Sequence, residues 1–157
     1  MMKSISPAFI SALALMIAGC TTQPQSITPE VPLLQLQDKT ISGQLSYRER
    51  IALVSGLTLR VMLMDVSKAD VPASLVAEEI RVLAGEQVPL PFSITVKEQQ
   101  LKTNMRYAVR ATISSQSGSL LWTTDTVYPV DPDPTRLEQD LGTLTLVQSR
   151  QSRGQLP

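Results

Sequence analysis

Hydrophobic and polar residues alternate along much of the chain between residues 40 and 130. A period of two places apolar side chains on one face of a β-strand and polar side chains on the other, so each alternating segment predicts a half-buried strand. The clearest of these segments are residues 40–48, 57–66, 105–113 and 120–130. In the last of them Leu120, Trp122 and Tyr128 share one face, and we expect Trp122 to lie in the core.

Two further apolar segments give weaker signals. Residues 75–84 fit a strand, but their apolar positions also fit helical spacing. We predict a strand because strands flank the segment on both sides and no helix-capping pattern closes it, with the helix as the open alternative. Residues 88–96 are apolar and β-branched but contain Pro89 and Pro91, which cannot donate ladder hydrogen bonds. This segment is therefore predicted at the edge of a sheet.

The C-terminal region interrupts the alternation. Residues 131–134 read Asp-Pro-Asp-Pro and end the pattern, residues 135–141 fit one or two helical turns, and residues 143–148 fit a last short strand. The predicted fold is all-β: a single immunoglobulin-like antiparallel β-sandwich of about seven strands over residues 40–130. Residues 131–157 then form a C-terminal extension with a frayed tail.

The N-terminal region has a different pattern. Residues 5–18 form an apolar run after Lys3, and the run ends close to Cys20, the one cysteine in the chain. The run is shorter than the about 20 residues of a membrane span, so residues 1–19 are predicted to be a signal peptide. Residues 20–39 follow as a lipid anchor and flexible tether, rich in Pro, Gln and Thr.

Three aliphatic or small residues, Ile17, Ala18 and Gly19, precede this cysteine. They resemble the lipobox of bacterial lipoproteins, and the resemblance implies that Cys20 is lipidated. Acyl chains would then attach the protein to a membrane surface. Lipoproteins with this motif stay in the inner membrane mainly when aspartate follows the cysteine. Thr21 stands at that position, which implies an outer-membrane lipid anchor that faces the periplasm.

Composition excludes several classes of function. The chain has 14 basic and 14 acidic side chains and no basic stripe with interleaved aromatics, so nucleic acid is not an expected partner. It has no histidine, and its one cysteine is the predicted lipidation site, so a histidine-dependent triad, a histidine-rich zinc site and a thiolate metal site all lack ligands. We predict no metal and no cofactor.

A carboxylate pair is the remaining catalytic candidate. Glycoside hydrolysis needs two carboxyl groups about 5 to 10 Å apart across a sugar-binding cleft. Asp65 and Asp70 are close in sequence, but the same pattern describes a solvated loop, and aromatic residues make up only 4% of the chain. We therefore predict no catalytic residue and a protein that is not an enzyme.

A candidate partner surface consists of Met62, Met64, Arg110 and Asp125. The two methionines lie on the outer face of the strand predicted at 57–66, where flexible apolar side chains suit an adaptable groove. The alternative is that another segment of the chain covers them. Two strand registers are open for the charged pair: Arg110 lies either diagonal to Asp125 or directly opposite it, on the solvent face in both cases. An exposed pair of this kind contributes less than about 1 kcal/mol.

Five phrases carry a resemblance to a known family. They are YRERIAL at 47–53, DVSKADVPA at 65–73, VPLPFSI at 88–94, RYAVRATI at 106–113 and LLWTTDTVYPV at 120–130. Together and in this order they resemble the YbaY lipoprotein family, which is similar to the YscW-type pilotins of type III secretion. Those pilotins are small outer-membrane lipoproteins with an immunoglobulin-like β-sandwich that bind the C-terminal segment of a secretin.

The resemblance implies a location more than an activity. We expect a non-catalytic, outer-membrane-anchored lipoprotein that acts in envelope integrity or as a binding module for another envelope protein. The first alternative is a pilotin-like chaperone that binds a secretin C-terminal segment. The second alternative is a polysaccharide-related envelope protein.

Overall fold

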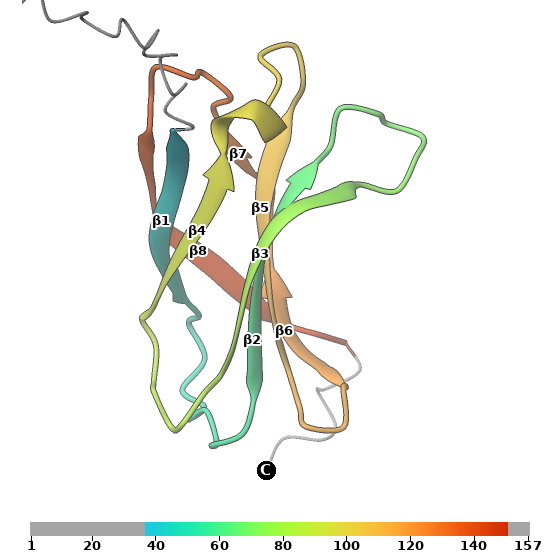
Figure 1. The fold of residues 1–157 in the computed structure, drawn as a ribbon. Helices are drawn as coiled ribbons and strands as arrows, with labels where there is room; N and C mark the ends of the chain where they lie inside the picture. The colour runs from blue at the N-terminus through green and yellow to red at the C-terminus, as the bar shows by residue number, and fades with distance from the viewer. Residues whose placement is uncertain (1–36, 151–157) are drawn as a thin grey trace, which may run out of the picture. The chain divides into compact units, whose positions relative to one another are not determined.

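The computed structural model describes residues 37–150 of the 157-residue chain. The predicted signal peptide, the lipobox and Cys20 lie outside the described residues. Within them the fold is all-β, as predicted, with eight strands and one short 3-10 turn (Figure 1). The strands are β1 (Asp38–Ser46), β2 (Thr58–Asp65), β3 (Ser74–Val82), β4 (Leu90–Lys97), β5 (Tyr107–Ser114), β6 (Leu120–Thr124), β7 (Tyr128–Val130) and β8 (Glu138–Gln148). No helix in this part of the chain has the length and apolar character needed to cross a membrane.

The strands form one continuous hydrogen-bonded path in the order β3-β2-β5-β6-β8-β1-β4, and β7 pairs with β5 beside this path. All pairs are antiparallel except β1 with β8, which is parallel. The sequence predicts about seven antiparallel strands in two sheets. The structure instead has an eighth strand, one parallel pair and a single sheet that curls toward closure.

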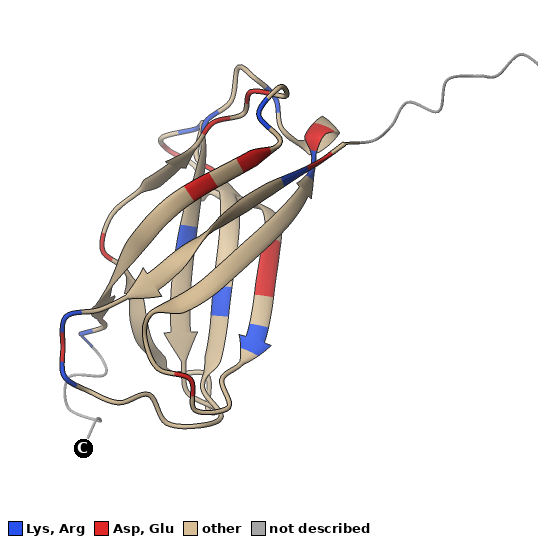
Figure 2. Ribbon diagram, turned by 90° about the vertical axis from the view of Figure 1, so that its left-hand side faces the viewer, with Lys and Arg blue, Asp and Glu red and all other residues tan. Residues whose placement is uncertain are grey.

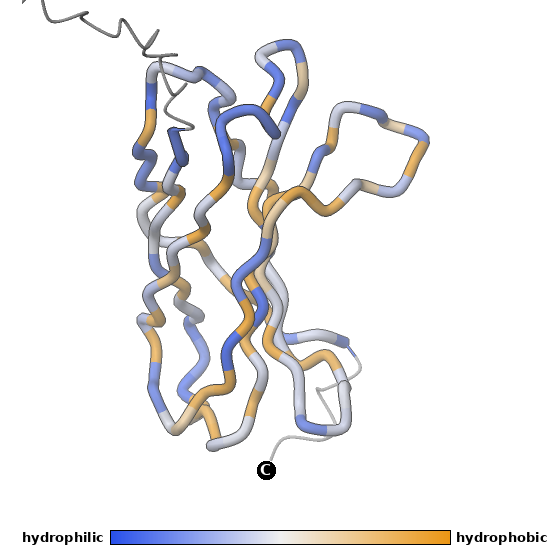
Figure 3. Tube along the Cα trace, in the orientation of Figure 1, coloured by the Kyte–Doolittle hydropathy of each residue, from blue (hydrophilic) through white to orange (hydrophobic). Residues whose placement is uncertain are grey.

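Alternation along the strands produces the core. In β4 every second residue is buried, and the exposed residues between them are polar or proline. The tube in Figure 3 shows this change between apolar and polar residues along the strands. Trp122 is 1% exposed and stacks on Tyr47, with ring centroids 4.1 Å apart. Each fully buried large apolar side chain contributes about 1.5 to 3 kcal/mol, so these inward faces hold the sheet in its curled form.

The two weaker strand predictions are confirmed. Residues 75–84 contain most of β3, which pairs with β2 along its whole length, and β4 lies at one end of the sheet path. The two edges meet through side chains. Glu79 on β3 accepts a hydrogen bond from the Ser93 N–H on β4 at 2.8 Å, and Arg81 donates from Nη2 to the Pro91 carbonyl at 2.8 Å.

The C-terminal prediction needs correction. The helical turns expected at 135–141 do not form, because the carboxylates of Asp131 and Asp133 accept hydrogen bonds from nearby backbone N–H groups and fold the segment into turns. The short strand predicted at 143–148 is confirmed as the second part of β8, which has 11 residues, is the longest described strand and lies between β1 and β6. The packed domain therefore extends to residue 148, beyond the boundary predicted at residue 130.

Lys39 fixes the segment that leads into β8. Its side chain is buried, and Nζ donates hydrogen bonds to the carbonyl oxygens of Asp133 at 3.2 Å and of Arg136 at 2.6 Å. Burial lowers the pKa of Lys39, and the negative charge of Asp131 opposes part of that shift. Basic and acidic residues are interspersed along the strands and loops of the domain (Figure 2), in agreement with the balanced composition.

Candidate groove on the outer face of strand β5

The candidate site lies beside β5, where the chain between its neighbours β6 and β7 leaves the sheet. Thr112 on β5 lies opposite Thr123 on β6, but Val109, three residues earlier, lies opposite Tyr128 on β7, five residues later. Three steps on β5 thus correspond to five steps on the facing chain. The two additional residues bow outward between β6 and β7, and they leave an opening beside the middle of β5.

The outward bow is held by hydrogen bonds to β8. The N–H of Asp125 donates to the carbonyl of Thr145 at 3.1 Å, and the N–H of Thr145 donates to the hydroxyl of Tyr128 at 2.7 Å. The Tyr128 hydroxyl in turn donates to the Asp125 carboxylate at 3.0 Å. This closed set of three bonds gives the first wall of the site, which we call the 125–127 wall, a defined shape.

The second wall is the start of the loop between β2 and β3. The N–H of Val66 donates to the carbonyl of Arg106 at 2.8 Å, and the N–H of Arg106 donates to the hydroxyl of Ser67 at 2.8 Å. The Arg106 guanidinium also donates from Nη2 to the Ser67 carbonyl at 3.1 Å. Hydrogen bonds from the Ser67 side chain and backbone lower the pKa of Asp65 at the base of this loop. The wall is therefore tied to the first residues of β5.

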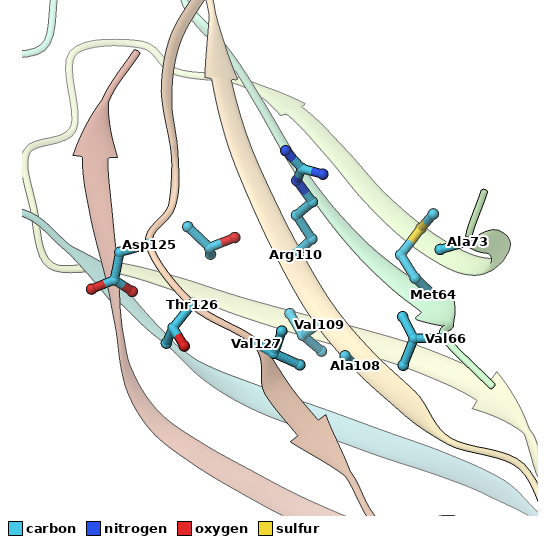
Figure 4. A pocket seen from close by; sticks show the side chains of 10 residues that line it. Met64, Val66, Ala73, Ala108, Val109, Arg110, Asp125, Thr126 and Val127 are labelled. Atoms are coloured by element: carbon cyan, nitrogen blue, oxygen red, sulfur yellow. The ribbon is translucent and has the colours of Figure 1, made fainter. Parts of the chain in front are cut away.

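Between the walls lie two cavities of about 300 and 410 Å³ that share Val66 and Val127. Together they form one groove along the outer face of β5, from Arg110 toward Tyr107, and we call it the β5 groove. Figure 4 shows the first cavity, with Val66 and Met64 on one side and Asp125, Thr126 and Val127 on the other. The lining is mainly apolar, so the groove is suited to binding apolar side chains.

Three of the four residues predicted as a partner surface, Met64, Arg110 and Asp125, line the first cavity. The fourth, Met62, lies outside that lining and opposite Arg110 in the β2–β5 ladder. The β5–β6 ladder has the second of the two predicted registers, the one that sets Arg110 directly opposite Asp125, because Thr112 pairs with Thr123 and Ile113 with Trp122. The two charged residues line one cavity, but the structure forms no ion pair between them. The facing chain leaves β5 at Asp125, so a regular cross-strand position is not reached.

Val127 and the two walls of the groove are not predicted from the sequence. Val127 is 67% exposed and Val71, in the β2–β3 loop, is 55% exposed. The segment 120–130 is predicted as one continuous strand because the face that carries Trp122 continues through β-branched threonines to Tyr128. A weak signal was present: the Asp125-Thr126 pair is polar and Pro129 follows, and both features are typical of a strand break.

The chemistry available in the groove is that of binding. Across residues 37–150 no group of three or more metal-ligating side chains comes together. The polar side chains in the first cavity are Arg110, Asp125 and two threonines. These groups offer one cation, one anion and two hydroxyls for recognition of a peptide or another polar ligand.

Comparisons with known proteins agree on one family. Residues 36–141 match the family described as "Type III secretion system lipoprotein chaperone (YscW)". The chain is 28% identical to the uncharacterized lipoprotein YbaY of Escherichia coli K12, over 82% of this chain and 73% of that protein. The solved structure of an alternative pilotin from the type II secretion system of Vibrio cholerae is 37% identical, with a TM-score of 0.62, and the match covers 71% of this chain and 99% of the pilotin.

The family match includes β1 to β7 and the first residues of β8, which is the part of the chain that forms the β5 groove. The matched family consists of lipoprotein chaperones and not of enzymes, in line with the prediction from composition. The resemblance to YbaY and to YscW-type pilotins is confirmed. The chain belongs to the YscW family of secretion-system lipoprotein chaperones.

Proposed function

We propose that this protein is a lipid-anchored pilotin that binds an envelope protein of a secretion system, such as a secretin, through the β5 groove. The observation that carries the proposal is the similarity to the Vibrio cholerae pilotin, which extends over 99% of that protein at 37% identity. The groove adds a surface of suitable chemistry. Its apolar lining includes the flexible Met64, which adapts its shape to the side chains of a bound peptide.

The location follows from the proposed anchor. We propose that Cys20 carries the acyl chains and holds the domain at the periplasmic face of the outer membrane. Two or more chains give stable attachment, because a single chain binds a membrane only reversibly. The lipobox residues Ile17, Ala18 and Gly19, together with Thr21, support this proposal.

Fatty-acid labelling tests the anchor. Cys20→Ser should abolish incorporation of a labelled fatty acid and release the protein from membranes. Thr21→Asp is the matched control: it should keep the label but move the protein to the inner-membrane fraction. Persistent labelling of Cys20→Ser would contradict lipidation at this cysteine, and an unchanged distribution of Thr21→Asp would contradict sorting by that position.

Binding to a secretin tests the function itself. The probe is a synthetic peptide that covers the C-terminal segment of a secretin from the same organism, and its binding is followed by fluorescence anisotropy. Val127→Asp places a charge on the 125–127 wall and should weaken binding at least tenfold, because an unpaired carboxylate would be desolvated there. Val82→Asp is a matched control on β3, since Val82 is 65% exposed and Val127 67%. Binding of no secretin segment by the unmodified protein would contradict the proposal.

The second candidate is a role in envelope integrity without a secretin partner, and the similarity to YbaY supports only its lipoprotein part, because YbaY is an uncharacterized lipoprotein. A deletion strain separates the two. Loss of secretin multimers from the outer membrane supports the pilotin function. Increased sensitivity to detergent with normal secretin assembly supports the envelope role. Altered surface polysaccharide in that strain would favour the third candidate, a polysaccharide-related envelope protein.

A further inference from the structure

We propose that Arg110 selects the bound segment by pairing with a carboxylate, so that the β5 groove takes a peptide with one acidic residue at the end of a short apolar run. The inference rests on the proposed pilotin function and names the chemistry of the partner segment. It goes beyond that function because it assigns a charge and its position to the partner segment.

The first argument is that Arg110 differs from the arginines on the neighbouring strands. Arg60 on β2 pairs with Glu78 at 2.6 Å, and Arg81 on β3 pairs with Glu79 at 3.5 Å. Arg106, which lines the far end of the groove, donates to the Ser67 carbonyl. In the described part of the chain the Arg110 side chain forms neither a hydrogen bond nor an ion pair with another residue, although its backbone lies in the β2–β5 ladder. Its guanidinium therefore keeps its full donor capacity for a ligand.

The second argument is that the carboxylate in the same cavity already accepts one hydrogen bond from within its own wall. Asp125 accepts a hydrogen bond from the Tyr128 hydroxyl at 3.0 Å, and its backbone N–H is bonded to Thr145. The side chain of Asp125 thus belongs to the bond set that shapes the 125–127 wall. In Figure 4 it lies across the cavity from Arg110, on the opposite side of the opening.

The third argument is the order of groups along the groove. Arg110 lies at one end of the first cavity, whereas Val66 and Val127 lie where the cavities join, and Met105 and Pro129 line the second cavity. The three residues from Arg110 to Tyr107 on β5 span about 10 Å. A matching peptide therefore places a carboxylate at Arg110 and apolar side chains over the next roughly 10 Å.

The surroundings strengthen such a pair. Apolar side chains on both walls exclude water when a peptide binds, and a charge pair in less polar surroundings attracts more strongly than one in bulk water. A guanidinium also binds a carboxylate with two parallel hydrogen bonds, which lysine cannot reproduce. Arg110→Lys should therefore bind more weakly than the native protein.

The experiment measures how tightly the full-length protein binds two peptides in separate titrations. The first is the secretin peptide described above, and the second is a copy in which the acidic residues are replaced by their amides. Arg110→Gln should weaken binding of the acidic peptide about tenfold or more and leave the amide peptide unaffected. Arg110→Glu should bind a copy with lysine at the acidic position better than it binds the original. Arg60→Gln, which removes an already paired arginine, is the control, and thermal melting checks that each variant is folded.

The outcomes separate the two proposals. If the unmodified protein binds no secretin peptide, the pilotin function fails. If the unmodified protein binds the peptide, but Arg110→Gln and Arg110→Glu bind it as tightly as the unmodified protein does, the inference about Arg110 is overturned while the function stands. The same holds if the amide copy of the peptide binds as tightly as the original peptide. Binding of anionic lipid vesicles that depends on Arg110, without dependence on the peptide carboxylate, would also overturn it.

Discussion

At the scale of single residues, the stacked pair of Trp122 and Tyr47 joins distant parts of the chain. The rings are 4.1 Å apart and inclined by 13°, and the Tyr47 hydroxyl donates to the carbonyl of Ile51. Burial raises the pKa of Tyr47, with a smaller effect from the negative charge of Glu49. The stack thus links β6 with the end of β1 and with the loop that follows it.

Trp122→Ala should lower the free energy of unfolding by about 3 to 5 kcal/mol, because the large ring leaves a cavity that its neighbours fill only partly. Urea denaturation followed by circular dichroism measures this loss. Val54→Ala is the control, since Val54 is 60% exposed and its truncation should change stability by no more than about 0.5 kcal/mol. Equal denaturation midpoints for Trp122→Ala and the native protein would contradict a core position for Trp122.

The burial and strand face of single residues are the features that the sequence predicts best. The burial of Trp122 and Tyr107 follows from alternation, because an apolar side chain of that size is stable only on the inner face of a strand. The position of Arg110 on an outer face follows from the same alternation. Its lack of an ion pair could not be predicted, because that depends on where the facing chain leaves β5.

At the scale of elements, the seam between β3 and β4 is the distinctive feature. Backbone ladders join the neighbouring strands along the sheet path. Its two end strands, β3 and β4, are instead joined by the side chains of Glu79 and Arg81. A second carboxylate, that of Glu86, also pairs with Arg81, at 3.2 Å. The charged seam satisfies edge groups that another β-strand would otherwise pair with, which protects the edge against association.

Glu79→Ala should raise the hydrogen-exchange rate of the Ser93 amide about tenfold, because that amide loses its acceptor. Nuclear magnetic resonance measures the exchange of this single amide. Glu79→Gln keeps an oxygen acceptor and should preserve part of the protection. Glu78→Ala is the matched control, since Glu78 pairs with Arg60 and has no bond to β4. Unchanged Ser93 exchange in Glu79→Ala would show that another group protects this amide.

At the scale of the whole molecule, β8 completes the sheet. It pairs with β1 on one side and with β6 on the other, and its residues Leu144 and Leu146 are buried in the common core. The bulge in the parallel pair lies at Gly43, where an added Cβ would be 2.8 Å from the carbonyl oxygen of Gly142. The backbone ladders of β8 therefore connect β3, β2, β5 and β6 with β1 and β4 in the sheet path.

A chain that stops after residue 137 should fail to fold, whereas a chain that stops after residue 150 should fold as the full protein does. Loss of β8 exposes edges of β1 and β6 and removes two buried leucines, each of which contributes about 2 to 5 kcal/mol. The combined loss from these two leucines is comparable to the total stability of a small domain, which is about 5 to 15 kcal/mol. A cooperative urea transition measures folding, and such a transition in the shorter chain would contradict a structural role for β8.

The sequence by itself determined the all-β class, the strands β1 to β6, the second part of β8 and the family, because alternation and family phrases are local properties of the chain. Only the tertiary structure decided the place of β8, the parallel pair with β1, the side-chain seam and the β5 groove. Each of these depends on residues far apart in the sequence, and pairing of distant strands is set by global packing and register. The groove exists because two residues between β6 and β7 leave the sheet, and no local pattern specifies that departure.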